Sequence, residues 1–509
     1  MKVQKSSILF AFWLVAAGAN VFAQAPANVS QVLMWSTLTD KPIDTTRGLI
    51  SKPLFSVYTT ATPVDAGSSA FVPTITNAQN YKVAHSSALS SALSSNIAVA
   101  LSVIPLSSPT SGVILKKDPV SGAELPASSS LGPIFTQRAE TVGKGKVYLG
   151  FTHQDYHFTS INGEKLNGLT VLYGGGDASG IRLGSTATAT APATFNMGLD
   201  VRLSQDLAFL TFGVTNRFDV SVGLPTVHSA VSARSYNGVV YSGSGDEFKS
   251  DGTQCWCINT LTPGVKTLTM PQIGQASLSK SGFGDMLLRF KQEVFENQRA
   301  SMAVGADVRL PTGDADNYLG IGTTAVKPFF ALSLYSKRLA NGLIFAPHFD
   351  AGWQFSGKSV LGGTLNGAQT NAALQGGATI PVTGAPLVST KGFVPDVFSW
   401  SAGTEVAVGR KNTVVLDMFG NTIGLIHGAQ LLRTQNIAAP APTDLQGAIP
   451  MSKGLTDGGR GSYNQYSGSF GYKVKVMGNL VATAQALVRF DNNGLTARVV
   501  PLFGLGYSF

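Results

Sequence analysis

The sequence is poor in charged residues and has no long hydrophobic run. Only 13% of its 509 residues are charged, which is about half of the ~25% found in average soluble domains. Its mean hydropathy of +0.16 is too high for a disordered chain, yet no stretch reaches the ~18 consecutive apolar residues that a membrane helix needs. A disordered chain and a helical membrane protein are therefore excluded, and the apolar residues must be spread thinly along the chain.

Cysteine is scarce as well. Two cysteines in the whole chain exclude a disulfide scaffold. Cys255 and Cys257 are separated by one residue and have no second ligand pair elsewhere, which does not match the spacing of a metal site. We expect a local cross-link or two free thiols in a loop, and no metal.

Signals for nucleotide and nucleic-acid binding are also missing. The glycines at 174–176 and 320–322 are not followed by the lysine and helix of a phosphate-binding loop. The net charge of +9 comes from Lys and Arg that are scattered rather than clustered, so it does not form a basic patch. We expect no cofactor and no nucleic-acid partner.

The first residues have the pattern of a secretory signal peptide. Lys2 and Lys5 precede an apolar stretch over 8–19 that is too short to span a bilayer. The small residue Ala23 completes a cleavage site, and no lipoprotein cysteine follows it. We predict a signal peptide over 1–23 and an exported mature chain, the alternative being an uncleaved anchor.

From about residue 141 onwards, apolar and polar residues alternate. In the last strand, large apolar side chains from Val499 to Phe509 share one face, and mostly small or polar ones share the other. Similar alternation recurs near 195–203, 217–224, 285–293, 301–310, 343–355, 469–476 and 480–490. These lengths suit tilted membrane strands, whose apolar side faces lipid while the other side faces a polar lumen. We predict an all-β fold, a transmembrane antiparallel β-barrel of about 12–14 strands over 141–509, with a soluble sandwich as the alternative.

The links between these strands differ in length. Short links at 296–298 and 340–342 indicate tight turns. Long polar links indicate external loops at Tyr173–Pro192, Tyr241–Lys280, Gly357–Pro395 and His427–Tyr466. Long loops at one end and short turns at the other are typical of outer-membrane barrels.

The segment over 24–140 does not alternate and contains a helix signal. Leu89, Leu93, Ile97, Leu101 and Ile104 recur at helical spacing, with serines on the opposite side. We predict an amphipathic helix over 86–104 within an N-terminal plug, the alternative being a helix at the surface or in the periplasm.

Charged residues fall on the face of the strands that we assign to the lumen. Opposite signs share this face, so that side chains of neighbouring strands can pair across the sheet. The predicted lumen-lining residues are Asp200, Arg202, Arg217, Asp219, Arg289, Lys291, Glu293, Asp307, Arg309, His348 and Asp350. His348 also raises the alternative of a hydrolase with this residue as general base, although no serine nucleophile can be chosen.

Several phrases resemble a known family. They are Ile134–Thr141 with Gly143–Lys146, Gly282–Asp285, Val308–Asp314 with Leu319–Gly322, and Ala346–Phe349. In this order they resemble the outer-membrane transporter family labelled by the meta-pathway of phenol degradation, which is similar to the long-chain fatty-acid transporter barrels. The resemblance runs from about Leu89 to the C-terminus, and its family motif is Pro311, Thr312, Gly313 and Asp314.

The resemblance implies passive uptake of small hydrophobic or aromatic compounds through a plugged barrel. Phe509, with Tyr507 two residues before it, resembles the signal read by the barrel-assembly machinery. We therefore expect a non-enzymatic transporter that lies among outer-membrane lipids. The alternatives are a general diffusion porin, an outer-membrane hydrolase and an adhesive or structural barrel.

Overall fold

The structure is a computed structural model. The residues that it describes are 28–33, 61–63, 71–73, 92–105, 115–117, 124–126, 131–133, 135–173, 193–242, 258–262, 265–297, 299–335, 344–363, 390–409, 411–437 and 452–509. The predicted signal peptide over 1–23, Cys255 and Cys257 lie outside these residues, and the division into signal peptide, plug and barrel stays a prediction.

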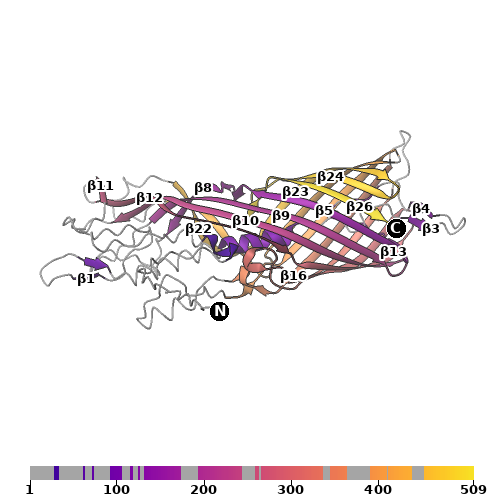
Figure 1. Ribbon diagram of the computed structural model, residues 1–509, viewed down its shortest axis with the longest axis horizontal. Coiled ribbons are helices and arrows are strands. Elements are labelled where there is room, and N and C mark those ends of the chain that lie inside the picture. Colours follow the sequence, from indigo (N-terminus) through magenta and orange to yellow (C-terminus); the bar gives the residue numbers. More distant parts are fainter. Residues whose placement is uncertain are drawn as a thin grey trace, which may run out of the picture.

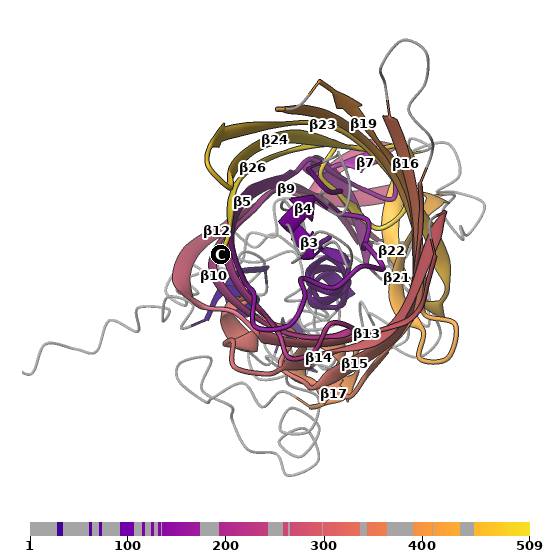
Figure 2. The same cartoon turned by 90° about the vertical axis from the view of Figure 1, so that its right-hand side faces the viewer.

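Twelve antiparallel strands close into a barrel, as the alternation predicts (Figures 1 and 2). Each strand pairs with the next, and the last, β26, pairs with the first, β5. The strands are β5 (Val147–Phe158), β9 (Ala193–Gly213), β10 (Phe218–Ser242), β13 (Met286–Glu296), β14 (Ala300–Leu310), β15 (Ala325–Leu334), β16 (Ile344–Ser356), β19 (Val397–Val408), β20 (Asn412–Ile423), β23 (Tyr463–Met477), β24 (Leu480–Arg489) and β26 (Val499–Ser508).

Five further strands extend the wall beyond this ring at the end opposite to the C-terminus (Figure 1). They are β8 (Asn167–Tyr173), β11 (Ile258–Thr262), β12 (Val265–Phe283), β21 (Ala429–Ile437) and β22 (Ser452–Gly461). β10 shows how this works, because it pairs first with β13 and then, further out, with β12. The predicted loops Tyr241–Lys280 and His427–Tyr466 are therefore wrong in part, since strands occupy much of both.

The remaining elements are short. They are η1 (Val29–Gln31), η2 (Ala315–Asn317), η3 (Val360–Gly362), β1 (Ala61–Pro63), β2 (Phe71–Pro73), β3 (Leu115–Lys117), β4 (Glu124–Pro126), β6 (Ser160–Ile161), β7 (Glu164–Lys165), β17 (Lys358–Ser359), β18 (Gly392–Phe393) and β25 (Leu495–Thr496).

The links over 214–217 and 478–479 are short, and the C-terminus lies at the same end of the barrel. We call this the short-turn end.

An apolar belt surrounds the outside of the barrel. It is made of large side chains that a water-soluble sheet would bury, yet Phe503 is 56% and Leu210 47% exposed. Further members are Leu149, Phe151, Phe212, Phe290, Val304, Phe349, Phe355, Leu416, Met418, Phe470, Tyr472 and Leu505. A continuous exposed belt of this kind is the lipid-facing surface of a transmembrane barrel.

The polarity of the two faces reverses along β9. Near the short-turn end, Leu210 and Phe212 point outward and are exposed, and Thr211 points inward and is buried. Further out the inward side becomes apolar, while the outward side carries Asp200 and Arg202. The prediction that Asp200 and Arg202 line the lumen is therefore wrong: they bond to each other on the outer face, with side chains 45% and 60% exposed.

The helix over 92–103 explains this reversal. It lies inside the barrel (Figure 2), and its Leu93 and Ile97 share one hydrophobic cluster with Met197 and Leu199 of β9 and Val231 of β10. The outer part of the wall therefore buries apolar side chains on the inside, against the helix, and presents polar ones to water. Alternation identifies the two faces of a strand but does not say which face points inward.

The observed helix is shorter than predicted. It occupies 92–103 of the predicted 86–104, and residues 86–91 lie outside the described part of the chain. Its position inside the barrel matches the predicted plug rather than a surface helix. Within the described residues, no helix has the length and the apolar run to cross a membrane.

The reversal on β9 predicts that an arginine lowers the free energy of unfolding by different amounts at two sites on the outward face of this strand. Leu210→Arg places a charge in the lipid-facing belt, where an arginine costs up to ~2–4 kcal/mol. Ser204→Arg, on the same outward face, adds its charge where the wall is polar, and we expect a cost below ~1 kcal/mol. Reversible unfolding in phospholipid vesicles measures both, and equal costs would contradict the reversal.

Candidate functional site in the barrel lumen

A segment of extended chain crosses the lumen near the short-turn end. We call residues 131–142 the strap, of which Ile134 is not described. Its first residue, Leu131, donates its N–H to Thr413 of β20, and its last, Val142, donates to Asp219 of β10. Because β20 and β10 belong to different parts of the wall, the strap spans the inside of the barrel (Figure 2).

Wall side chains accept hydrogen bonds from the strap backbone. The Gln137 N–H donates to Asp350 at 2.8 Å, and the Ala139 N–H donates to Ser333 at 3.0 Å. Asp417 accepts from the Thr136 hydroxyl at 2.7 Å. Buried backbone N–H groups need acceptors, and a lone extended segment has no neighbouring strand to supply them. Inward carboxylates and hydroxyls of the wall take that role.

Two wall lysines bind the strap carbonyls. The Lys473 ammonium donates to the Pro133 carbonyl at 2.7 Å. The Lys291 ammonium donates to the carbonyls of Arg138 and Glu140 at 3.2 and 2.5 Å. Both lysines are buried, so their charge is compensated by carbonyl dipoles and by nearby carboxylates rather than by water.

A buried charge cluster anchors the middle of the strap. The Arg138 guanidinium lies 3.2 Å from the Glu405 carboxylate of β19, with side chains 1% and 0% exposed. The other Glu405 oxygen lies 2.6 Å from His348 Nε2 of β16. An ion pair so deeply buried costs several kcal/mol when one partner is removed, because the other charge stays behind without compensation.

Glu140 joins this cluster from the strap. It accepts a hydrogen bond from the Ser333 hydroxyl at 2.7 Å. Burial disfavours its charged form, but the charges of Arg138 and His348 and the Ser333 bond hold the pKa of Glu140 below its usual value. Glu140 is therefore an anion that ties the strap to β15.

Ser333, His348 and Glu405 together look like a catalytic triad, but the hydrogen bonds oppose that role. The single hydroxyl hydrogen of Ser333 points to Glu140, so the His348 Nδ1 at 3.1 Å must donate to Ser333 rather than accept from it. A general base has to accept this proton. This arrangement therefore favours structural anchoring over the hydrolase alternative.

Most of the remaining predicted lumen residues do point inward. Arg289 and Asp307 form a bidentate pair with distances of 2.5 and 2.7 Å, joining β13 to β14. Lys291 lies 3.9 Å from Asp219, and Glu293 accepts from Ser301 at 2.6 Å. These contacts link neighbouring strands, and several of the same residues also hold the strap.

Arg217 differs from the prediction. It lies exposed in the turn between β9 and β10, away from the buried Asp219. Its side chain therefore does not line the lumen, because the strand begins one residue later, at Phe218.

The family motif makes a turn beside the wall. The Thr312 hydroxyl donates to the Gly284 carbonyl, and the Gly313 N–H donates to Asp285. Asp314 caps η2, and the Tyr318 that follows contacts Ser94 of the lumen helix at 2.8 Å. The motif thus positions a contact with the helix and contributes no lumen-lining charge of its own.

The lumen helix ends above the strap. Arg309 of β14 donates to the Leu101 carbonyl at 3.0 Å, and Gln154 of β5 donates to the Pro105 carbonyl at 3.0 Å. Carbonyls at the end of a helix lack partners within the helix, so these wall side chains supply them. The wall thus fixes the end of the helix in the same way as the strap.

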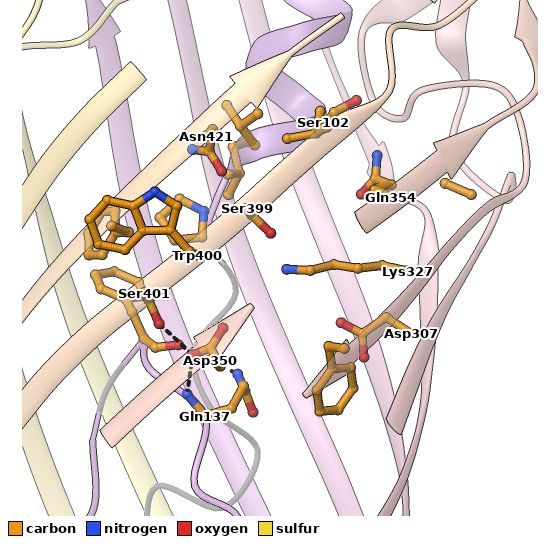
Figure 3. A pocket seen from close by; sticks show the side chains of 18 of the residues that line it. Ser102, Gln137, Asp307, Lys327, Asp350, Gln354, Ser399, Trp400, Ser401 and Asn421 are labelled. Carbon is orange, nitrogen blue, oxygen red and sulfur yellow. Dashed lines mark hydrogen bonds between the residues drawn. The ribbon is translucent and has the colours of Figure 1, made fainter. Parts of the chain in front are cut away.

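A cavity of about 110 Å³ lies between the end of the helix and the strap. The end of the helix and the two residues after it contribute Ser102–Pro105, and the strap contributes Phe135 and Gln137. Wall residues close the sides, among them Lys327, Asp350 and Ser401, which Figure 3 shows around the open space. A molecule that passed through the barrel would meet the helix, then this cavity, then the strap.

Sequence reasoning missed several of the residues that matter most here. Glu405, Asp417 and Lys327 received no role, and neither did Arg138 within its family phrase. Glu405 and Lys327 each stand on a strand with few other charges. A lone charge on an otherwise uncharged strand was the sequence feature that could have pointed to a role for these two residues. Among the described residues, no group of three or more His, Cys, Asp or Glu side chains is placed to hold a metal ion.

A known protein family matches part of the chain. The family described as "Putative MetA-pathway of phenol degradation" matches residues 180–377, which is less than half of the chain. The match confirms the resemblance indicated by the sequence motifs. No match was found among curated proteins.

Several solved barrels are similar in structure. An outer-membrane channel from Pseudomonas putida F1 is 10% identical, with a TM-score of 0.39, and covers 73% of this chain and 98% of its own. A FadL homologue from Pseudomonas aeruginosa is 11% identical, with a TM-score of 0.27, over 80% of this chain and 98% of its own. The NanC porin is 7% identical, with a TM-score of 0.30, and the match covers 71% of this chain and 98% of the porin chain.

The charge cluster predicts that Arg138→Met loosens the strap. Losing one partner of a buried ion pair costs about 3 kcal/mol or more, so we expect backbone amides of 135–142 to exchange roughly 100-fold faster. Hydrogen–deuterium exchange with mass spectrometry in detergent measures this. Arg217→Met, the same change at an exposed turn, is the control and should leave the strap unaffected; equal exchange in both variants would contradict the anchoring role.

Proposed function

We propose that the protein is a passive channel for small hydrophobic or aromatic compounds, closed at rest by the strap. The observation that carries this is the strap itself, which crosses the lumen and is held to the wall by hydrogen bonds and ion pairs that can break and re-form. A purely structural barrel needs no such removable barrier. A compound moves down its gradient, so no nucleotide or cofactor takes part.

The choice of compound rests on two observations. The outer part of the lumen is apolar, with Leu199, Val201 and Val231 facing the helix. The matching family carries phenol degradation in its description. An apolar entrance favours partition of molecules with a hydrophobic part over sugars or inorganic ions, because it offers sugars and inorganic ions no polar partners to replace water.

The route follows the order of the elements. A compound enters at the end opposite to the short turns, passes between the helix and the apolar wall, and reaches the cavity beside Phe135. It leaves when the strap moves aside. The strap's partners remain on the wall, so the barrier can close again after passage.

Location and assembly complete the proposal. The apolar belt fits a bilayer, and we place the protein in the bacterial outer membrane after export by the predicted signal peptide. Phe509 is 63% exposed just after β26, where assembly machinery can reach it. Outer-membrane lipid and this machinery are the proposed partners.

The first test measures phenol uptake by a variant whose strap can be cross-linked to the wall by a disulfide. Ala139→Cys and Ser333→Cys, in a chain with Cys255→Ser and Cys257→Ser, place two thiols where the backbone N–H of 139 meets the side chain of 333. We expect cells lacking the native gene to accumulate labelled phenol with this variant only under reducing conditions. Each single-cysteine variant is a control. Accumulation that is unaffected by deleting the gene would overturn the proposal.

The second test separates this channel from a general porin. In planar bilayers we expect the native chain to give little steady current, because the strap and helix fill the lumen. Arg138→Met should raise the fraction of time in conducting states by at least tenfold, whereas Arg217→Met should not. A large steady current from the native chain would favour the porin alternative.

A further inference from the structure

Lys327 of β15 is a cation with no direct partner among the residues that the structure describes. Its side chain extends into the cavity between helix and strap, toward Ser399 (Figure 3). Asp350 and Asp307 influence it electrostatically, yet it makes no hydrogen bond or ion pair with any residue that the structure describes. Charges inside proteins are normally paired, so an ammonium at the edge of a cavity that makes no direct contact is suited to bind an anion that enters the cavity.

The nearby carboxylates already have other donors. Asp307 receives two bonds from Arg289. Asp350 receives the Gln137 N–H and the Ser401 hydroxyl, as the dashed lines in Figure 3 show. Both acids thus take their hydrogen bonds from groups other than Lys327, which acts on Asp350 through its charge alone.

The other cations of the cavity are also accounted for. Arg289 bonds Asp307 and the Gln137 side chain, and Arg309 bonds the Leu101 carbonyl at the end of the helix. Asp285, which lies beyond the cavity lining, balances Arg309 and itself accepts N–H groups of Gly313 and Ile321. Among the three lining cations, Lys327 alone donates no hydrogen bond to a residue that the structure describes.

The rest of the lining suits an anion that carries an apolar group. Phe135, Phe329 and Phe419 contribute aromatic rings, and Asn421 contributes a side-chain amide that can donate hydrogen bonds. The volume of about 110 Å³ is below the ~150 Å³ of an apolar cavity known to bind benzene, so a ring with a carboxylate fits only when the strap or the end of the helix shifts. A hydrated inorganic ion would leave the rings without contacts.

We propose that this cavity binds the carboxylate of a small aromatic acid, with Lys327 as its ion partner and the phenyl rings around its apolar part. This names a substrate class and rests on the proposed channel function. The ligand lies against Phe135 of the strap and against Ser102–Pro105 at the end of the helix, so its arrival touches both parts of the barrier.

The test is equilibrium binding of benzoate and of its neutral analogue benzamide to the full chain in detergent, measured by calorimetry. We expect the native chain to bind benzoate at least tenfold more tightly. Lys327→Met should abolish this preference, and Lys327→Arg should restore part of it. Lys411→Met, the same change at an exposed turn, should keep the preference. Folding of each variant is checked by its heat-dependent migration in gels.

Three results would overturn the site: no benzoate binding to the native chain, equal binding of benzoate and benzamide, or a preference that survives Lys327→Met. Displacement of benzoate by equimolar chloride or phosphate would show that the cavity takes inorganic anions, which also contradicts the assignment. Binding in detergent needs no transport. If the protein prefers benzoate but deleting its gene leaves phenol accumulation unchanged, the channel is refuted and the site stands. If deleting the gene lowers phenol accumulation but the protein shows no benzoate preference, the site alone is refuted.

Discussion

The backbone of the strap imposes the main constraint on this barrel. An extended segment that crosses a lumen has no adjacent strand, so each of its buried N–H and C=O groups needs a side chain from the wall. Asp350, Asp219 and Lys291 are examples, and each stands on a different strand. The polar inner surface is therefore largely a complement to one peptide segment rather than a lining for water.

This complement also explains why charges are so deeply buried. Arg138 and Glu405 are almost fully enclosed, an arrangement that contributes little net stability but makes any other position of the strap unfavourable. Such pairs define one resting place for the strap. A molecule that displaces the strap has to compensate for the loss of these strap–wall contacts. The interactions that the molecule makes in the cavity therefore determine whether it passes.

The barrel was predictable from the sequence because period-two alternation is a local signal that a strand carries by itself. β13, β14 and β16 follow it, and their inward charges lie where the alternation puts them. Asp200 and Arg202 were misassigned because the direction of a face depends on what fills the lumen, which no single strand encodes. The strap contacts were unpredictable for the same reason: Ala139 and Ser333 are 194 residues apart and meet only in three dimensions.

The reversal of polarity along β9 has one more consequence. Where the outward face changes from Ala208 and Leu210 to Ser204 and Arg202, the wall itself marks the level of the bilayer surface. Sliding the barrel inward would drag Arg202 toward hydrocarbon, and sliding it outward would expose Leu210 to water. The strand thereby sets the immersion depth of the whole molecule, and with it the height of the cavity and the strap within the membrane.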